Sequence, residues 1–317
     1  MSTLKRVSVV IPVNNERESL PELWDELTQV MEGKFDYDLV FVDDGSSDGS
    51  FEYLKERALE NERSQVIRFL ANYGKSSALA AGFEKASGDY VVTLDSDLQD
   101  DPGEIPALIE VLEGGFDLVS GWKKERRDPL AKRVSSKLFN VTTRFLTGIS
   151  LHDFNCGLKA YRRQVIKSLD VYGGMHRYIP VIAGKKGFRI TEKVVAHRPR
   201  KYGTTKFGRE RYFHGLFDLL TVLFLSRYTR RPLHLFGLFG MVSLVAGFLI
   251  NLWVLYLKYG VGDPFRKHLA LLVLGVLLLI LGVQFISIGL LGEMIAQSGP
   301  RRGVIIQEVV SPERPKA

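Results

Sequence analysis

The chain has 317 residues, of which 45% are hydrophobic and 25% are charged, and its formal net charge is +7. This length suits one large domain with an additional segment. Cys156 is the only cysteine, which excludes an intrachain disulfide and favours a cytosolic setting for the soluble part. Residues 1–6 have no long apolar run directly behind their charges, so a cleavable signal peptide is not expected.

Short apolar runs alternate with helical patterns over roughly the first 120 residues. Strands that alternate with helices at about 25-residue intervals predict βαβ units and a mainly parallel sheet. The expected fold class is therefore α/β. Buried strands are predicted at residues 6–12, 39–42, 66–70, 90–94 and 117–120, and helices at 18–31 and 76–86.

Polar side chains follow three of the predicted strands. They are Asn14 and Glu16 after the first, Asp44 after the second, and Asp95 and Asp97 after the fourth. Because ligands of open α/β folds bind outside the carboxyl ends of the strands, these groups are expected at one binding edge. Closely spaced carboxylates suit Mg²⁺ or Mn²⁺ when a diphosphate completes the coordination. The alternative for each acidic group is ordinary turn or helix-cap chemistry.

The motifs of two other nucleotide-binding folds are missing. No Gly-x-Gly-x-x-Gly follows the first strand, and the full P-loop pattern Gly-x-x-x-x-Gly-Lys-Ser/Thr is absent. The dehydrogenase and P-loop NTPase interpretations therefore lose their main support.

From about residue 233 onward the chain becomes mostly apolar. Residues 233–257 contain no Asp, Glu, Lys or Arg, and in residues 269–292 only Gln284 is strongly polar. Each run exceeds the roughly 20 residues that cross a bilayer core, and buried helices of a soluble protein are the alternative. Flanking charges favour neither orientation strongly, so placement of the large domain in the cytoplasm, at the inner membrane, depends on the cysteine count and the missing signal peptide. Basic residues are concentrated in residues 122–137 and 198–231, and because these basic stretches flank membrane segments, nucleic-acid binding is disfavoured.

Five motifs occur in order along residues 10–161. In these motifs the chain resembles the family 2 glycosyltransferases, and within them the polyisoprenyl-phosphate glycosyltransferases of the bactoprenol glucosyltransferase or dolichol-phosphate-mannose-synthase type. The likeness covers most of residues 5–210, and the two apolar runs match the bacterial membrane-anchored subgroup. The motifs are Val10-Ile11-Pro12-Val13-Asn14-Asn15-Glu16, Val42-Asp43-Asp44-Gly45-Ser46, Asn72-Tyr73-Gly74-Lys75, Asp95-Ser96-Asp97-Leu98-Gln99-Asp100 and Asp153-Phe154-Asn155-Cys156-Gly157-Leu158-Lys159-Ala160-Tyr161.

The resemblance implies a GT-A fold, which binds a nucleotide sugar and uses a divalent metal, Mg²⁺ or Mn²⁺. It also implies roles for individual residues. The processive synthases of the wider family carry a Gln-x-x-Arg-Trp motif that is absent here, which favours one sugar per acceptor. The expected roles are Pro12, Asn14 and Glu16 lining the nucleoside pocket, Asp44 at the base or ribose, Lys75 at the diphosphate, Asp95 at the nucleotide sugar, and Asp97 on the metal with Gln99 as a further ligand.

Asp153 is the third expected catalytic residue, beside Asp95 and Asp97, and the resemblance makes it the candidate general base. A phosphate monoester has a second pKa near 6 and is largely deprotonated at neutral pH. Such a nucleophile needs little proton abstraction. Asp153 is therefore expected to position the acceptor or a basic partner such as Lys159.

An acceptor with a polyprenyl tail cannot leave the bilayer, so basic residues near the membrane are expected to receive its phosphate. The alternative is a general basic surface that is attracted to anionic lipid. The candidates are Arg126, Arg127, Lys132 and Arg133 on one side of the site, with Arg200 and Lys206 on the other.

The segments expected are a GT-A catalytic domain at 1–210, an interfacial amphipathic segment at 211–231, a transmembrane hairpin at 232–293 and a cytoplasmic tail at 294–317. The interfacial assignment depends on residues 212–228, which are apolar but interrupted by His214 and Asp218. The extended pattern of residues 303–310 would allow pairing with a neighbouring subunit, and so a homo-oligomer.

The expected function is inverting transfer of a hexose from a nucleotide sugar to undecaprenyl phosphate at the cytoplasmic membrane face, for cell-envelope glycosylation. UDP-glucose is the first choice of donor. The alternatives are GDP-mannose or a UDP-aminosugar in the same chemistry, and a non-catalytic membrane scaffold that binds lipid-linked sugars.

Overall fold

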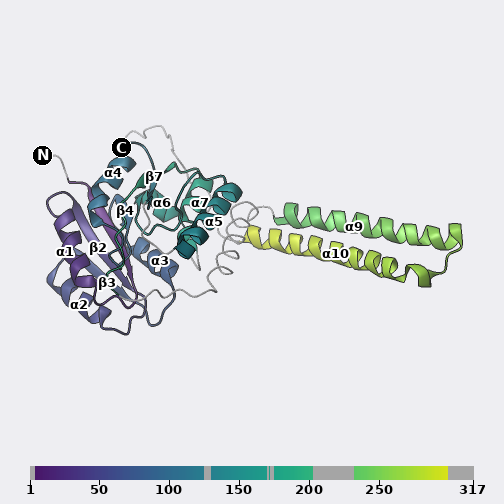
Figure 1. The fold of residues 1–317 in the computed structure, drawn as a ribbon, viewed down its shortest axis with the longest axis horizontal. Coiled ribbons are helices and arrows are strands. Elements are labelled where there is room, and N and C mark those ends of the chain that lie inside the picture. Colours follow the sequence, from purple (N-terminus) through teal and green to yellow (C-terminus); the bar gives the residue numbers. More distant parts are fainter. Residues whose placement is uncertain (1–3, 125–129, 170, 172–174, 203–231, 299–317) are drawn as a thin grey trace, which may run out of the picture. The chain divides into compact units, whose positions relative to one another are not determined.

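The computed structural model describes residues 4–124, 130–169, 171, 175–202 and 232–298. The chain divides into two compact units, one with the sheet and its helices and the other with two long C-terminal helices (Figure 1). The expected interfacial segment, residues 211–231, and residues 299–317 of the expected tail lie outside the described residues, while residues 294–298 of that tail belong to the last helix.

The first unit contains one seven-stranded sheet with the strand order β3-β2-β1-β4-β6-β5-β7. All neighbouring strands are parallel except β6, which is antiparallel to both β4 and β5. The prediction of a mainly parallel sheet is confirmed, and β6 and β7 are additional to the five predicted strands. The strands are β1 (Arg6–Val13), β2 (Asp36–Asp43), β3 (Ser64–Arg68), β4 (Tyr90–Thr93), β5 (Leu118–Trp122), β6 (Lys159–Arg162) and β7 (Ile190–Val194).

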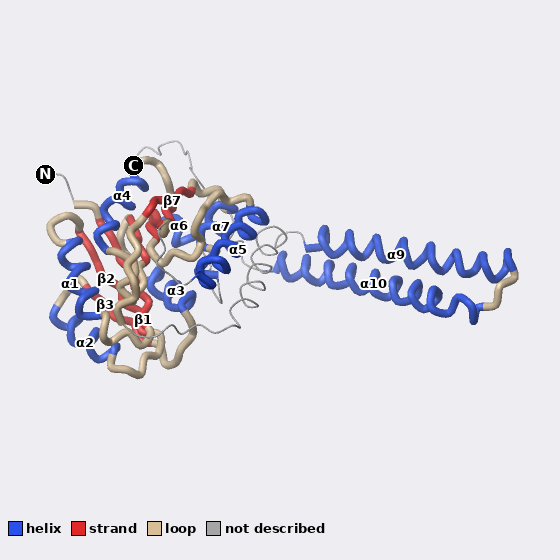
Figure 2. Tube along the Cα trace, viewed as in Figure 1, coloured by secondary structure: helices blue, strands red, loops and turns tan. Residues whose placement is uncertain are grey.

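Helices connect the strands, as the alternation of patterns predicts (Figure 2). The amphipathic pattern expected at 18–31 becomes a helix at Leu20, next to a proline whose missing N–H suits a first turn. The helices are α1 (Leu20–Met31), α2 (Ser50–Glu60), α3 (Lys75–Lys85), η1 (Pro102–Glu104), α4 (Ile105–Glu113), α5 (Leu130–Thr147), α6 (Arg163–Ser168), η2 (Met175–Arg177) and α7 (Ile179–Lys185).

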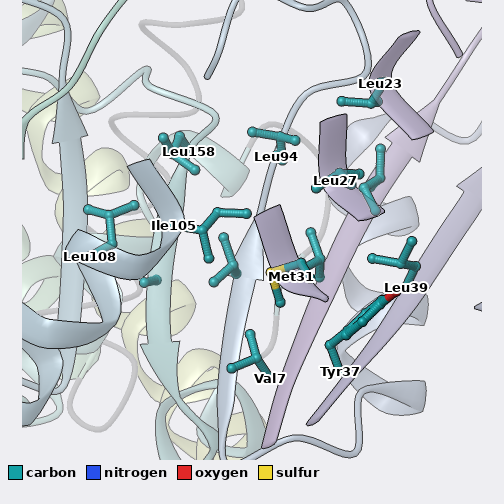
Figure 3. Packing of buried hydrophobic residues seen from close by; sticks show 14 of the residues in the cluster. Val7, Leu23, Leu27, Met31, Tyr37, Leu39, Leu94, Ile105, Leu108 and Leu158 are labelled. Atoms are coloured by element: carbon teal, nitrogen blue, oxygen red, sulfur yellow. The ribbon is translucent and has the colours of Figure 1, made fainter. Parts of the chain in front are cut away.

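The main core lies between the sheet and helices α1 and α4. Leu23, Leu27 and Met31 recur at helical spacing on α1 and pack with Val7 of β1 and Leu39 of β2 (Figure 3). Full burial of such an aliphatic side chain contributes about 1.5–3 kcal/mol. This layer holds the first strands rigidly, so the loops that follow them start from a fixed sheet.

Helix α3 approaches the sheet closely because its residues are small. A Cβ on Gly82 would lie 2.2 Å from Val10 Cγ1, so no larger residue fits at that point. Val10 points away from the face that carries Val7, because successive side chains alternate across a strand. Helix α3 therefore packs against β1 and β2 with its first residue, Lys75, near their carboxyl ends.

Strand register brings several loops to one edge of the sheet. Val13 at the end of β1 pairs with Asp43 at the end of β2, and Val10 pairs with Thr93 at the end of β4. Because β6 is antiparallel, its first residue, Lys159, pairs with Thr93. The loop before β6, residues 151–158, therefore reaches the same edge as the loops after β1, β2 and β4.

The second unit is a helical hairpin. The two predicted apolar segments are confirmed as helices long and apolar enough to cross a membrane, with mean hydropathies of 2.2 and 2.9. Only 17% and 11% of their most apolar windows are buried, which differs from core helices of a soluble protein. The elements are α9 (Pro232–Tyr256), η3 (Leu257–Val261), η4 (Phe265–His268) and α10 (Leu269–Ser298).

Small residues let the two long helices touch. A Cβ on Gly247 would lie 2.7 Å from the carbonyl oxygen of Gly275, and one on Gly282 would lie 2.9 Å from that of Gly240. Close backbone approach through glycine is a common way for helices to associate in lipid.

Candidate active site

The turn from Asp95 to Asp97 is anchored by the serine between them. Ser96 is 5% exposed, and its hydroxyl donates to the carbonyl of Pro12 at 3.1 Å. Its own carbonyl accepts from the Ser19 hydroxyl at 2.7 Å. These bonds fix the turn to the end of β1 and the start of α1. Sequence reasoning missed Ser96, although its place between two carboxylates is the signal that could have found it.

Asp95 lies between a lysine side chain and a glycine backbone. Lys75 Nζ donates to Asp95 Oδ1 in an ion pair. Gly157 lies so close that a Cβ there would be 2.5 Å from Asp95 Cγ. Burial acts to raise the pKa of Asp95, but the charge and hydrogen bond of Lys75 outweigh it and lower that pKa to about 2. Asp95 is therefore ionised, and its position depends on Lys75 and Gly157.

Asp97 is paired with an arginine from far along the chain. Arg200 Nη2 donates to Asp97 Oδ2 at 2.7 Å, and Arg200 Nη1 lies 3.8 Å from Glu16 Oε1. The backbone N–H of Gln99 donates to Asp97 Oδ1 at 3.2 Å. The structure thus places Glu16 and Asp97 beside the same guanidinium, while the roles of Glu16, Asp97 and Gln99 stay predictions. It also places Arg200 among them, whereas the sequence prediction assigned that residue to the opposite, lipid-phosphate side.

The carboxylates of Asp95 and Asp97 have the donor chemistry of a hard divalent cation that takes its other ligands from substrate phosphates and water. Within the described ranges, no group of three or more His, Cys, Asp or Glu side chains is arranged to hold a metal ion alone. Mg²⁺ or Mn²⁺ bound jointly with a diphosphate fits this arrangement, and a closed structural metal site does not.

Asp44, in the loop after β2, is hydrogen-bonded to two other loops. Its carboxylate accepts the N–H groups of Tyr73 at 2.7 Å and Gly74 at 2.9 Å, and its carbonyl accepts from Asn14 Nδ2 at 2.8 Å. Asp44 is only 4% exposed. The predicted nucleoside residues Asn14 and Asp44 therefore lie together, and Asp44 also shapes the turn that begins α3.

Asp153 lies in the loop before β6, with 1% of its surface exposed. Its carboxylate accepts the N–H of Asn155 at 3.0 Å, and Lys159 Nζ donates to the carbonyl of Cys156. Burial lowers the pKa of Lys159 and raises that of the Cys156 thiol to about 12. Asp153 in the loop and Lys159 at the start of β6 are thus both buried, while the role of Asp153 in positioning stays a prediction.

Asp100 precedes the helical element η1 but does not act as a helix-start charge. It is fully buried, and its Oδ1 lies 2.6 Å from Lys123 Nζ. Asp101 does have that role, because its side chain accepts from the N–H of Gly103 at the start of η1. The sequence pattern could not separate the two neighbours, because the partner of Asp100 is Lys123, which follows the end of β5.

His176 adds a neutral group near Lys75. Its ring Nδ1 lies 3.0 Å from the hydroxyl of Ser76, which also accepts the His176 backbone N–H at 3.0 Å. Burial, and then the charge of Lys75, hold the pKa of His176 well below its usual value. These contacts fit a structural role for His176.

The other expected lipid-phosphate residues are less fully described. Lys132 and Arg133 belong to α5. Arg126, Arg127 and Lys206 lie outside the described residues, as does the interfacial segment 212–228. Their roles remain predictions.

Comparison with known proteins assigns the family. Residues 8–170 match the model of Glycosyl transferase family 2. The chain is 37% identical to undecaprenyl-phosphate 4-deoxy-4-formamido-L-arabinose transferase of Proteus mirabilis, and the match covers 98% of this chain and 96% of that enzyme. The Salmonella paratyphi B enzyme of that name is also 37% identical, with 98% and 95% covered. The chain therefore belongs to glycosyl transferase family 2 and to its polyisoprenyl-phosphate group, as the resemblance predicts.

Solved structures support the GT-A fold. Glucosyl-3-phosphoglycerate synthase from Mycobacterium tuberculosis, in complex with phosphoglyceric acid, aligns with a TM-score of 0.53 and 22% identity, over 70% of this chain and 80% of that one. Its complex with Mn²⁺, UDP-glucose and phosphoglyceric acid gives the same TM-score and identity, over 70% and 79%. The predicted α/β class and GT-A architecture are confirmed.

Proposed function

We propose that the protein transfers one sugar from a nucleotide sugar to undecaprenyl phosphate at the cytoplasmic face of the inner membrane, with inversion at the anomeric carbon. The observation that carries the site assignment is the meeting of Asp95, Asp97, Glu16 and Asp44 at one edge of the sheet, with Lys75 and Arg200 supplying positive charge. The two apolar helices support the choice of a membrane-bound acceptor. The undecaprenyl acceptor is taken from the names of the relatives.

In this reaction an acceptor phosphate oxygen forms a bond to the anomeric carbon, while the bond from that carbon to the nucleoside diphosphate breaks. The phosphate is largely deprotonated at neutral pH, so no strong base is required. A divalent cation held by Asp97, with Gln99 beside it, would stabilise the charge on the leaving diphosphate. Asp95 would orient the donor sugar, and Lys75 would hold Asp95 ionised. Asp153 would position the acceptor from the loop before β6.

For the donor we propose a UDP-linked sugar of the amino-substituted type, with 4-deoxy-4-formamido-L-arabinose as the first candidate. The names of the curated relatives carry that sugar, and glucose does not occur in them. UDP-glucose, the first choice from the sequence, therefore becomes the comparison donor.

A transfer assay with defined donors tests the proposal. Purified full-length protein, undecaprenyl phosphate and one labelled nucleotide sugar at a time should place label in the lipid fraction, most strongly with the UDP-linked formamido sugar. EDTA should stop the transfer, and added Mg²⁺ or Mn²⁺ should restore it. A lipid fraction without label for every donor would favour the non-catalytic scaffold, and transfer unaffected by EDTA would contradict the metal assignment.

A further inference from the structure

Arg200 links the two halves of the proposed site. The sequence predicted that Arg200 binds the acceptor phosphate. In the structure its Nη2 lies 2.7 Å from Oδ2 of Asp97, the carboxylate proposed to bind the metal. We propose that Arg200 is a positioning residue shared between Asp97 and the acceptor phosphate, so that its release from Asp97 couples donor binding to acceptor binding. This inference rests on the proposed function and adds an order of events to it.

The backbone that carries Arg200 is fixed beside the Asp97 loop. Asp100 and His197 form a β-bridge, and the N–H of Arg198 donates to the carbonyl of Gln99 at 3.0 Å. Arg198 is also held by both oxygens of Glu26, at 2.7 and 2.8 Å. With its backbone anchored two residues away, Arg200 can change partners by side-chain rotation alone.

The contact with Asp97 is of a kind that a stronger ligand can displace. The side chains of Arg200 and Asp97 are 25% and 13% exposed, so the pair is neither fully buried nor fully solvated. A divalent cation and a guanidinium at Asp97 repel each other, because both are positive. A cation that binds with the donor diphosphate therefore opposes the ion pair of Arg200.

A released Arg200 has a better partner in the acceptor. The planar guanidinium binds phosphate through two parallel hydrogen bonds, which are among the strongest that side chains make. Its other carboxylate neighbour, Glu16, is 3.8 Å away and offers a weaker contact. Donor binding should thus raise the affinity for acceptor, and by linkage acceptor binding should raise the affinity for the donor and its cation by the same factor.

Two binding measurements on the full-length protein in lipid nanodiscs test this. The first is Mn²⁺ affinity in the presence of UDP, from the electron paramagnetic resonance signal of free Mn²⁺. Arg200→Gln should bind Mn²⁺ roughly fivefold more tightly than the wild type, because a competing ion pair of this exposure contributes up to about a factor of five. Arg200→Lys should lie between the two.

The second measurement is the affinity for a short fluorescent polyprenyl phosphate, with and without UDP and Mn²⁺. The wild type should bind it more tightly when UDP and Mn²⁺ are present, and Arg200→Gln should lose this increase. Arg189→Gln is the matched control, because Arg189 pairs with Asp117 at the start of β5, at the opposite edge of the sheet from the site. It should behave as the wild type in both measurements.

Unchanged Mn²⁺ affinity in Arg200→Gln would overturn the inference, and so would acceptor binding that still responds to UDP and Mn²⁺ in that variant. Failure of the proposed function would give a different result, namely no sugar transfer by the wild type with any donor.

Discussion

At the scale of single residues, Gly157 limits the position of the Asp95 carboxylate. Its missing side chain leaves space for Asp95, since a Cβ would come within 2.5 Å of the carboxyl carbon. The hydroxyl of Thr93, at the end of β4, donates to the Gly157 carbonyl at 2.8 Å, which holds the glycine in place. Asp95 therefore cannot move toward the loop before β6.

Gly157→Ala should displace Asp95 and lower kcat/KM by on the order of 10- to 100-fold, as small displacements of catalytic groups do. The effect should appear in donor turnover more than in the unfolding temperature. Gly237→Ala is a suitable control, because a Cβ there would meet its nearest neighbour at an ordinary 3.6 Å. Equal activity of Gly157→Ala and the wild type would refute the assigned role.

His176 should make the protein less stable in acid. Its folded-state pKa lies well below the ordinary value of 6.5, chiefly because of burial. Between those two values the unfolded chain binds a proton that the folded chain does not, so stability falls as pH decreases, by up to about 1.4 kcal/mol per pH unit. Thermal unfolding at pH 7.5 and 5.5 should show a smaller acid loss for His176→Gln than for the wild type. A loss of the same size in both would exclude this histidine as the cause.

Residue types and spacing predicted the acidic edge but not all of its contacts. Asp95 and Asp97 stand out in the sequence because two carboxylates follow an apolar strand. Arg200, the partner of Asp97, does not stand out in the sequence. It is 103 residues away from Asp97, and the bridge between Asp100 and His197 brings the two segments together. Ion pairs of such long range depend on tertiary packing, which spacing does not encode.

At the scale of elements, the reversed strand β6 organises the second half of the sheet. It inserts between β4 and β5, so the loop before it faces the ends of both. Each of the five predicted strands contains at least two adjacent Val, Ile, Leu or Phe residues, and β6 contains none. Strand β6 has only four residues, one of them the buried Lys159, and this is why pattern reasoning passed over it.

The connection after β4 is held to β5 by the buried pair of Asp100 and Lys123. Lys123→Met should leave a buried unpaired carboxylate and destabilise the first unit by about 3–5 kcal/mol. Adding Asp100→Asn should recover much of that loss, because it removes the buried charge. Chemical unfolding followed by tryptophan fluorescence measures both effects. A single variant as stable as the wild type would show that the pair contributes little.

At the scale of the whole molecule, a soluble-type sheet unit and an apolar hairpin occur in one chain. Their division was visible in the sequence because hydropathy changes near residue 233. The glycine contacts between α9 and α10 were not predicted, since glycines are also scattered along other parts of both runs.

Gly247→Leu should separate α9 from α10, because even a Cβ there would lie 2.7 Å from the Gly275 carbonyl. Thermal stability in detergent and transfer to lipid acceptor should both fall, while UDP affinity should stay unchanged. Gly237→Leu is the control, because among the described residues a Cβ at that position meets only Leu233 of its own helix within 4 Å. A parallel loss of UDP affinity in Gly247→Leu would contradict independence of the two units.

The single reversed strand also bears on how such a protein can diverge. Strands β1–β4 precede β5–β7 in the chain, and the two groups are hydrogen-bonded only along the short ladder between β4 and β6. A recombination breakpoint just after β4 would therefore separate parts that are contiguous both in sequence and in space. Under the proposed function, the loops with Asn14 and Asp44 could be inherited unchanged, while the part after the breakpoint, which carries Asp95, Asp97 and β6, acquired a new sugar or acceptor.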